Sequence, residues 1–107
     1  MPKNEVANRR GGPRVTLVAE AKVTDLKTES TFKCRISELA SKGCYLDVLN
    51  PLPDGSDVTV VITRDKGVFQ SRGRIVYNNP GMGLGVVFMD TDPEQQRILD
   101  GWLQEGN

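Results

Sequence analysis

The sequence predicts a mainly β domain, built as a six-stranded antiparallel barrel or sandwich with one α-helix at its C-terminal end. Three observations favour this class. Six short runs alternate apolar and polar residues, strong turn residues separate the runs, and only the segment after residue 91 changes to a helical period. A chain of 107 residues suffices for one domain with a modest core. We favour the barrel, because closure leaves no strand edge exposed.

The strands are predicted from alternation. Apolar residues at positions 15, 17, 19, 21 and 23 are expected to share the inner face of the first strand, and Phe32, Cys34 and Ile36 that of the second. Four further runs span residues 44–48, 58–63, 68–77 and 82–89. Turns are predicted where Pro, Asp, Asn and Gly gather, at 53–55, 65–67 and 79–81.

The last segment is predicted to be an amphipathic helix. Asp92 is suited to the N-cap, Pro93 to the first helical position, and Gln95 to the capping-box partner. One face of this helix then carries its apolar residues, Ile98, Leu99, Trp102 and Leu103. We therefore expect Trp102 to anchor the helix on the barrel rather than to stack on a nucleobase.

The composition of the chain argues against several classes of function. Fourteen basic and fourteen acidic residues leave no global positive field, which argues against a nucleic-acid partner. Two cysteines without any histidine make neither a disulfide framework nor a zinc site, so Cys34 and Cys44 are expected to be buried free thiols. No catalytic motif or metal cluster is evident, and we expect a protein that is not an enzyme.

The distribution of apolar residues indicates where the protein is located. No apolar stretch reaches the length of a membrane span, and the N-terminus is too polar for a signal peptide. We therefore expect a cytoplasmic protein without membrane insertion. Residues 1–8 are expected to be a flexible segment, followed by one domain over residues 9–104.

Positive charge gathers ahead of the first strand. The run 8–15 holds Arg9, Arg10 and Arg14, and a Gly-Gly-Pro spacer bends the chain between the last two. Arg10 and Arg14 can then point at one object, and their planar guanidinium groups match phosphate oxygens and guanine edges. This run is interpreted as a clamp for an anionic, guanine-bearing ligand; the alternative is a solvated basic tail.

A second group of residues ends the second predicted strand. The segment 38–43 contains Glu38, Ala40 and Gly43, and small residues ending in Gly predict a tight turn that can approach a ligand closely. The alternative for Glu38 is an exposed turn carboxylate without a ligand.

Taken in order, these features resemble the PilZ domain family, the bacterial receptor modules for cyclic di-GMP. The family signature is Arg-x-x-x-Arg before the first strand, then Asp/Asn-x-Ser-x-x-Gly between the second and third strands. Arg10 and Arg14 match the first motif and Gly43 matches the end of the second. The glycine-rich run 81–88 and the terminal helix extend the resemblance to residues 8–104.

The resemblance implies a ligand-binding set of Arg9, Arg10, Arg14, Glu38, Ala40 and Gly43. In the family, the arginines take phosphate oxygens and guanine edges, and the N-terminal segment folds over the ligand as a switch. It also implies cyclic di-GMP as the ligand, no cofactor, and an unidentified effector protein as a further partner. Because Arg9 adds a third guanidinium, we expect two nucleotides per domain.

Two positions depart from the signature. Ala40 replaces the family's serine and loses one hydrogen bond, worth about 0.5–1.5 kcal/mol, while Glu38 replaces Asp or Asn on a longer arm. We expect weakened rather than abolished binding. The alternative is a degenerate PilZ-like adaptor that acts through protein contacts without nucleotide.

Overall fold

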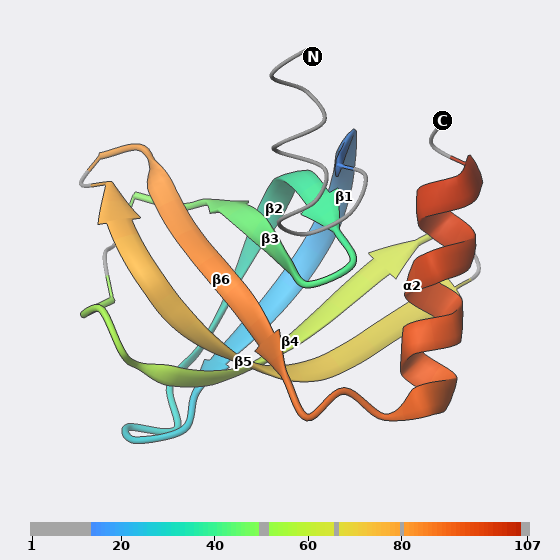
Figure 1. Ribbon diagram of the computed structural model, residues 1–107. Helices are drawn as coiled ribbons and strands as arrows, with labels where there is room; N and C mark the ends of the chain where they lie inside the picture. Colours follow the sequence, from blue (N-terminus) through green and yellow to red (C-terminus); the bar gives the residue numbers. More distant parts are fainter. Residues whose placement is uncertain (1–13, 50–51, 66, 80, 106–107) are drawn as a thin grey trace, which may run out of the picture.

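The computed structural model describes residues 14–49, 52–65, 67–79 and 81–105, with Arg14, Val15 and Leu17 described by their backbone alone. Arg9, Arg10 and the expected flexible segment 1–8 lie outside the described residues. The six predicted strands and the terminal helix are all present (Figure 1). The strands are β1 (Arg14–Asp25), β2 (Thr31–Ala40), β3 (Gly43–Asp47), β4 (Asp57–Arg64), β5 (Gly67–Asn79) and β6 (Gly83–Met89), and the helix is α2 (Pro93–Glu105).

The strands form a closed antiparallel barrel in the order β1-β2-β3-β6-β5-β4. The barrel closes because β1 pairs with β4 and β3 pairs with β6. The two strands of each of these pairs are not consecutive in the sequence. The predicted barrel is therefore confirmed. Its interior is filled by the inward apolar residues of all six strands and by α2, with Phe69 fully buried at 5.0 Å from the Phe88 ring and 6.5 Å from Trp102.

Bulges interrupt the strict alternation. The register of β1 against β2 shifts between Thr16 and Ala19, and Val18 is 65% exposed while Ala19 is buried. Ala19, Ala21 and Val23 are buried, as the alternation predicts, and the side chains of residues 15 and 17 lie outside the described part of the structure. An extra residue in one strand bends it and increases its twist, which a six-stranded barrel needs in order to close.

Helix α2 begins as predicted, but Gln95 makes a different hydrogen bond from the predicted one. Asp92 caps it by accepting a hydrogen bond from the Glu94 amide at 2.9 Å. Gln95 does not close a capping box; its Oε1 instead accepts a hydrogen bond from the Gln70 amide at 2.7 Å. Strand β6 pairs with β5 only from Arg72 of β5 onward, so the edge of β5 before Arg72 is not covered by β6. The hydrogen bond from Gln70 to Gln95 occupies part of that edge.

The helix packs by the predicted face, with Leu99, Trp102 and Leu103 buried and Ile98 partly buried. None of the helices in the described residues is long and apolar enough to cross a membrane.

The two thiols differ in burial. Cys44 is buried as expected, but Cys34 is only half-buried, because it lines a surface groove between strands. Burial, with a smaller effect from the Asp47 carboxylate, raises the pKa of Cys34 to about 11. Burial also raises the pKa of Cys44, so both thiols are protonated at neutral pH.

Candidate functional site

Strand pairing brings the end of the arginine run beside the predicted turn. In the ladder of β1 and β2, the backbone of Arg14 lies opposite Ala40, and Ala40 in turn lies opposite Gly43 of β3. Two segments that are well separated in sequence therefore meet at one end of the barrel wall. Arg9 and Arg10 precede this point in the chain and lie outside the described residues.

The turn itself is short and tied to its surroundings. Glu38 and Ala40 still belong to β2, and only Ser41 and Lys42 form the connection to β3. The Phe88 amide of β6 donates to the Lys42 carbonyl at 2.8 Å, and Gln96 Nε2 of α2 lies 3.5 Å from the Ser41 carbonyl. These contacts fix the turn against both β6 and α2.

Close packing between β3 and β6 requires a glycine at position 43. A Cβ at this position would clash with the backbone carbonyl oxygen of Val86, where β3 and β6 pair closely. The sequence suggested that a glycine here allows close approach to a ligand, whereas the structure shows a close approach between two strands. A role of Gly43 toward a ligand stays a prediction.

Glu38 occupies an exposed position with polar neighbours across both ladders. It lies opposite Thr16 of β1 and opposite Tyr45 of β3. Ala40 is half-buried. The wall around Glu38 thus offers a carboxylate and hydroxyl groups on adjacent strands, although position 40 itself carries none.

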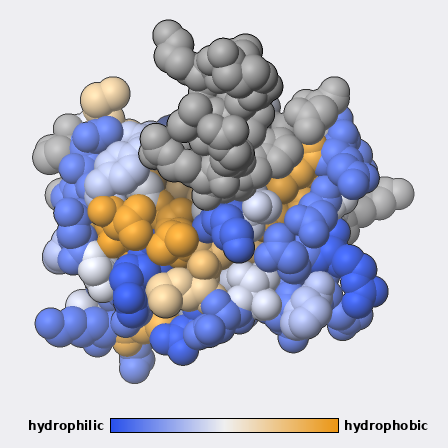
Figure 2. Space-filling view, in the orientation of Figure 1, coloured by the Kyte–Doolittle hydropathy of each residue, from blue (hydrophilic) through white to orange (hydrophobic). Residues whose placement is uncertain are grey.

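Two tyrosines extend this wall and were not singled out from the sequence. The rings of Tyr45 on β3 and Tyr77 on β5 lie 6.0 Å apart between centroids, at an interplanar angle of 37°. Tyr77 is 48% exposed, and Val76 and Met82 close to it in sequence are also exposed. Figure 2 shows one hydrophobic area beside β5 and β6 and a second one on the side of α2. The only sequence signal was the Gly-x-Gly spacing of Gly83 and Gly85, which leaves room above β6.

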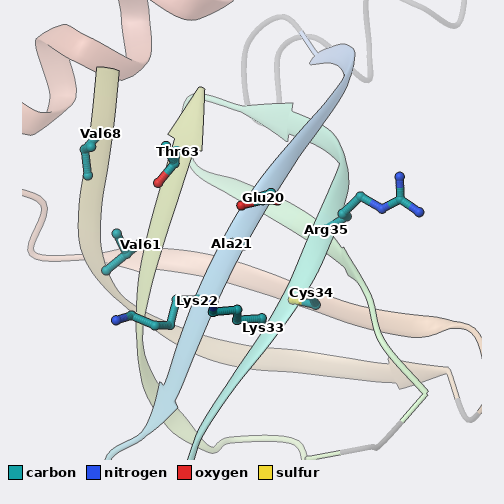
Figure 3. A pocket seen from close by; sticks show the side chains of 9 residues that line it. All are labelled: Glu20, Ala21, Lys22, Lys33, Cys34, Arg35, Val61, Thr63 and Val68. Carbon is teal, nitrogen blue, oxygen red and sulfur yellow. The ribbon is translucent and has the colours of Figure 1, made fainter. Parts of the chain in front are cut away.

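A groove of about 640 Å³ lies on another part of the barrel, over β1, β2, β4 and β5 (Figure 3). Lys22 and Lys33 face each other across β1 and β2, and Figure 3 shows both side chains reaching in one direction, with Arg35 pointing away. Val61, Thr63 and Val68 are among its other lining residues. Of the predicted site residues whose side chains the structure describes, Glu38, Ala40 and Gly43 do not line this groove.

Within the described part of the chain, no three His, Cys, Asp or Glu residues are arranged to hold a metal ion. Because Arg14 pairs with Ala40 there, the candidate site is the wall of β1, β2, β3, β6 and β5 that contains Glu38 and the two tyrosines. Its chemistry is suited to recognising a planar, hydrogen-bonding ligand.

Comparison with known proteins agrees with the fold. The sequence model of the PilZ domain matches residues 8–105. Among solved structures, the PilZ domain of YcgR from Escherichia coli, solved with c-di-GMP, aligns with a TM-score of 0.72 at 16% identity and covers 88% of each chain. The PilZ domain of CeSA from a cellulose-synthesizing bacterium aligns with a TM-score of 0.69 at 16% identity, covering 85% of this chain and 98% of that one.

A longer protein shares the same fold over part of its length. The inhibitor of motility MotI/DgrA from Bacillus subtilis aligns with a TM-score of 0.70 at 12% identity, over 86% of this chain and 48% of that one. No curated protein matches the sequence. At these identities, the structural likeness shows the fold.

Proposed function

Since this chain belongs to the PilZ domain family, we propose that it is a non-catalytic receptor that binds cyclic di-GMP and acts on an effector protein in the cytoplasm. The observation that supports the proposal is the pairing of Arg14 with Ala40, which brings the backbone of the last residue of the Arg-x-x-x-Arg motif beside the end of β2. The solved YcgR domain with c-di-GMP supports the choice of ligand.

The proposed roles follow from side-chain chemistry. Arg10 and Arg14 take phosphate oxygens and a guanine edge, because a guanidinium group donates two parallel hydrogen bonds to such acceptors. Glu38, exposed on β2, accepts from the N1 and N2 donors of a guanine. Arg9 is available for a second nucleotide.

Ligand binding also supplies a switch. Residues 8–13 lead into β1 at Arg14, so a ligand held by Arg10, Arg14 and Glu38 links this segment to the wall of the barrel. Ordering a segment over a ligand changes the surface that an effector meets. We assign no cofactor and no catalytic step.

Calorimetry with cyclic di-GMP tests the proposal, with GTP and cyclic di-AMP as controls. We expect binding of cyclic di-GMP alone. Arg10→Ala and Arg14→Ala should each weaken it by about 1.5–3 kcal/mol, roughly ten- to 150-fold, the range for hydrogen bonds to charged groups. Arg→Lys should also fail, because an ammonium group cannot donate as a planar fork.

Two results would contradict the clamp. Wild-type affinity in both alanine variants would remove the arginines from the site. No binding of cyclic di-GMP by the wild-type protein would favour the adaptor that works through protein contacts alone, a reading prompted by the missing hydroxyl at Ala40.

A further inference from the structure

We propose that Tyr45, supported by Tyr77, is a stacking surface for one guanine base of the ligand, directly beside Glu38. This inference rests on the proposed function and adds to it residues from β3 and β5. It is carried by the way the two rings lie on β6 and by their register with Glu38.

Both rings lie on glycines of β6. A Cβ on Gly83 would come 2.6 Å from Cε2 of Tyr45, and a Cβ on Gly85 would come 2.8 Å from Cδ1 of Tyr77. Gly83 and Gly85 are two residues apart, so they share the outer face of the strand. Each ring therefore packs against the backbone of β6, while Tyr77 is 48% exposed and Tyr45 is partly exposed.

The rings are also held in place. Asn79 Nδ2 donates to the Tyr45 hydroxyl at 3.3 Å, and the Tyr77 ring lies against Tyr45 at 6.0 Å. In the ladders, Tyr45 pairs with Gly85, and Gly85 pairs with Tyr77. The aromatic surface is thus organised before any ligand arrives, and this lowers the entropy that binding must overcome.

The position relative to Glu38 decides what can stack there. Residues directly opposite on neighbouring antiparallel strands have Cβ atoms about 4.5–5.5 Å apart, and Tyr45 is directly opposite Glu38. A base lying on the Tyr45 ring would then present one edge to β2. Guanine meets both demands, with a π-face for the ring and adjacent N1 and N2 donors for the carboxylate.

A second role for the tyrosines is to cover the glycine backbone of β6. That role predicts a loss of stability when the rings are removed and no change in ligand affinity. The two roles can therefore be separated by measuring stability and affinity on the same variants.

The test compares Tyr45→Leu, Tyr45→Phe and Tyr77→Leu with the wild-type protein, and uses Val68→Ala as a control. Val68 is 48% exposed, as Tyr77 is, and lies in the other groove. We expect Tyr45→Leu to weaken cyclic di-GMP binding about tenfold or more, the range for lost base stacking. Tyr45→Phe should stay within about threefold of wild type, because it keeps the ring, and Val68→Ala should be unchanged.

A spectroscopic readout identifies the contact itself. The guanine H8 proton should move further upfield on binding to wild type and Tyr45→Phe than on binding to Tyr45→Leu, because the ring current of the aromatic side chain at position 45 adds to that of any stacked guanine. Thermal unfolding of each variant shows that it is folded. If Tyr45→Leu is too unstable to use, the proton shift and Tyr77→Leu carry the test, with Tyr77→Leu expected to reduce both affinity and shift.

The outcomes separate this inference from the proposed function. If the wild-type protein binds, Arg14→Ala weakens binding, and Tyr45→Leu binds within twofold of wild type, the stacking role is overturned while the receptor function stands. An H8 shift of equal size in the wild-type and Tyr45→Leu complexes has the same meaning. Absence of binding by the wild-type protein overturns both.

Discussion

At the scale of single residues, positions 38 and 40 are where the proposed site departs from the PilZ signature. We expect the double variant Glu38→Asp with Ala40→Ser to bind cyclic di-GMP about three- to thirtyfold more tightly, because it restores a hydroxyl and shortens the carboxylate arm. Titration calorimetry measures this change. Ala40→Ser alone shows how much of it the hydroxyl supplies. Unchanged affinity, with arginine dependence intact, would place this end of β2 outside the site.

Cys34 gives a second prediction at this scale. Its pKa is raised from an ordinary 9.0 to about 11 in the folded protein. A thiol whose pKa is raised by folding stabilises the fold fully below its unfolded pKa and loses that contribution as the pH rises through the folded value. The free energy of unfolding should therefore fall between about pH 9 and pH 11, and fall less in Cys34→Ser. Parallel curves for the two proteins over that window would contradict the prediction.

At the scale of elements, two glycines make a matched pair. A Cβ on Gly43 would clash with the Val86 carbonyl oxygen, whereas a Cβ on Gly101, in the exposed part of α2, meets nothing within 4 Å. We expect Gly43→Ala to destabilise the fold by about 1–3 kcal/mol, as overpacking does. Gly101→Ala should stabilise it by about 0.5–1 kcal/mol through helix propensity.

Denaturant unfolding at equilibrium measures both changes. The same sign of change in the two variants would mean that contact with β6 is not what requires glycine at position 43. If only Gly43→Ala loses stability, its affinity for cyclic di-GMP is then measured well below the unfolding temperature of this variant. A lower affinity would show that the turn also contacts the ligand.

The elements themselves could be predicted from the sequence, because each depends on local pattern. Alternation and turn residues predicted six strands, and Asp92-Pro93 predicted the start of α2. The bulge before Ala19 could not be predicted, since it follows from closing the barrel rather than from any local preference. Gln95 was misassigned for a related reason. Its partner, the Gln70 amide, lies 25 residues away in sequence and becomes available only where β6 stops covering β5.

At the scale of the whole molecule, the candidate site depends on which strands become neighbours. The motif residues at the ends of β1 and β2 were visible in the sequence, and their meeting at Arg14 and Ala40 follows from antiparallel pairing of consecutive strands. Tyr45 and Tyr77 were not visible as a pair. They come together only because β6 inserts between β3 and β5 and offers two glycines beneath them.

The extent of that wall bears on stoichiometry. Thr16, Glu38, Tyr45, Gly85 and Tyr77 follow one another across five adjacent strands. With strands about 4.8 Å apart, this row runs for roughly 19 Å around the curved wall of the closed barrel. The arginine run adds a third guanidinium at Arg9, able to take a phosphate or to lie on an outer guanine.

We therefore expect two molecules of cyclic di-GMP per domain, bound as a stacked pair with one base on Tyr45. Titration of concentrated protein should give a molar ratio near two for wild type and a ratio that falls toward one for Arg9→Ala, since the second nucleotide loses its charge partner. Arg97→Ala, which removes an exposed arginine on α2, is the matched control and should leave the ratio unchanged. A ratio near one in the wild-type protein, unaffected by Arg9→Ala, would mean that the site holds one nucleotide and that Arg9 does not contact it.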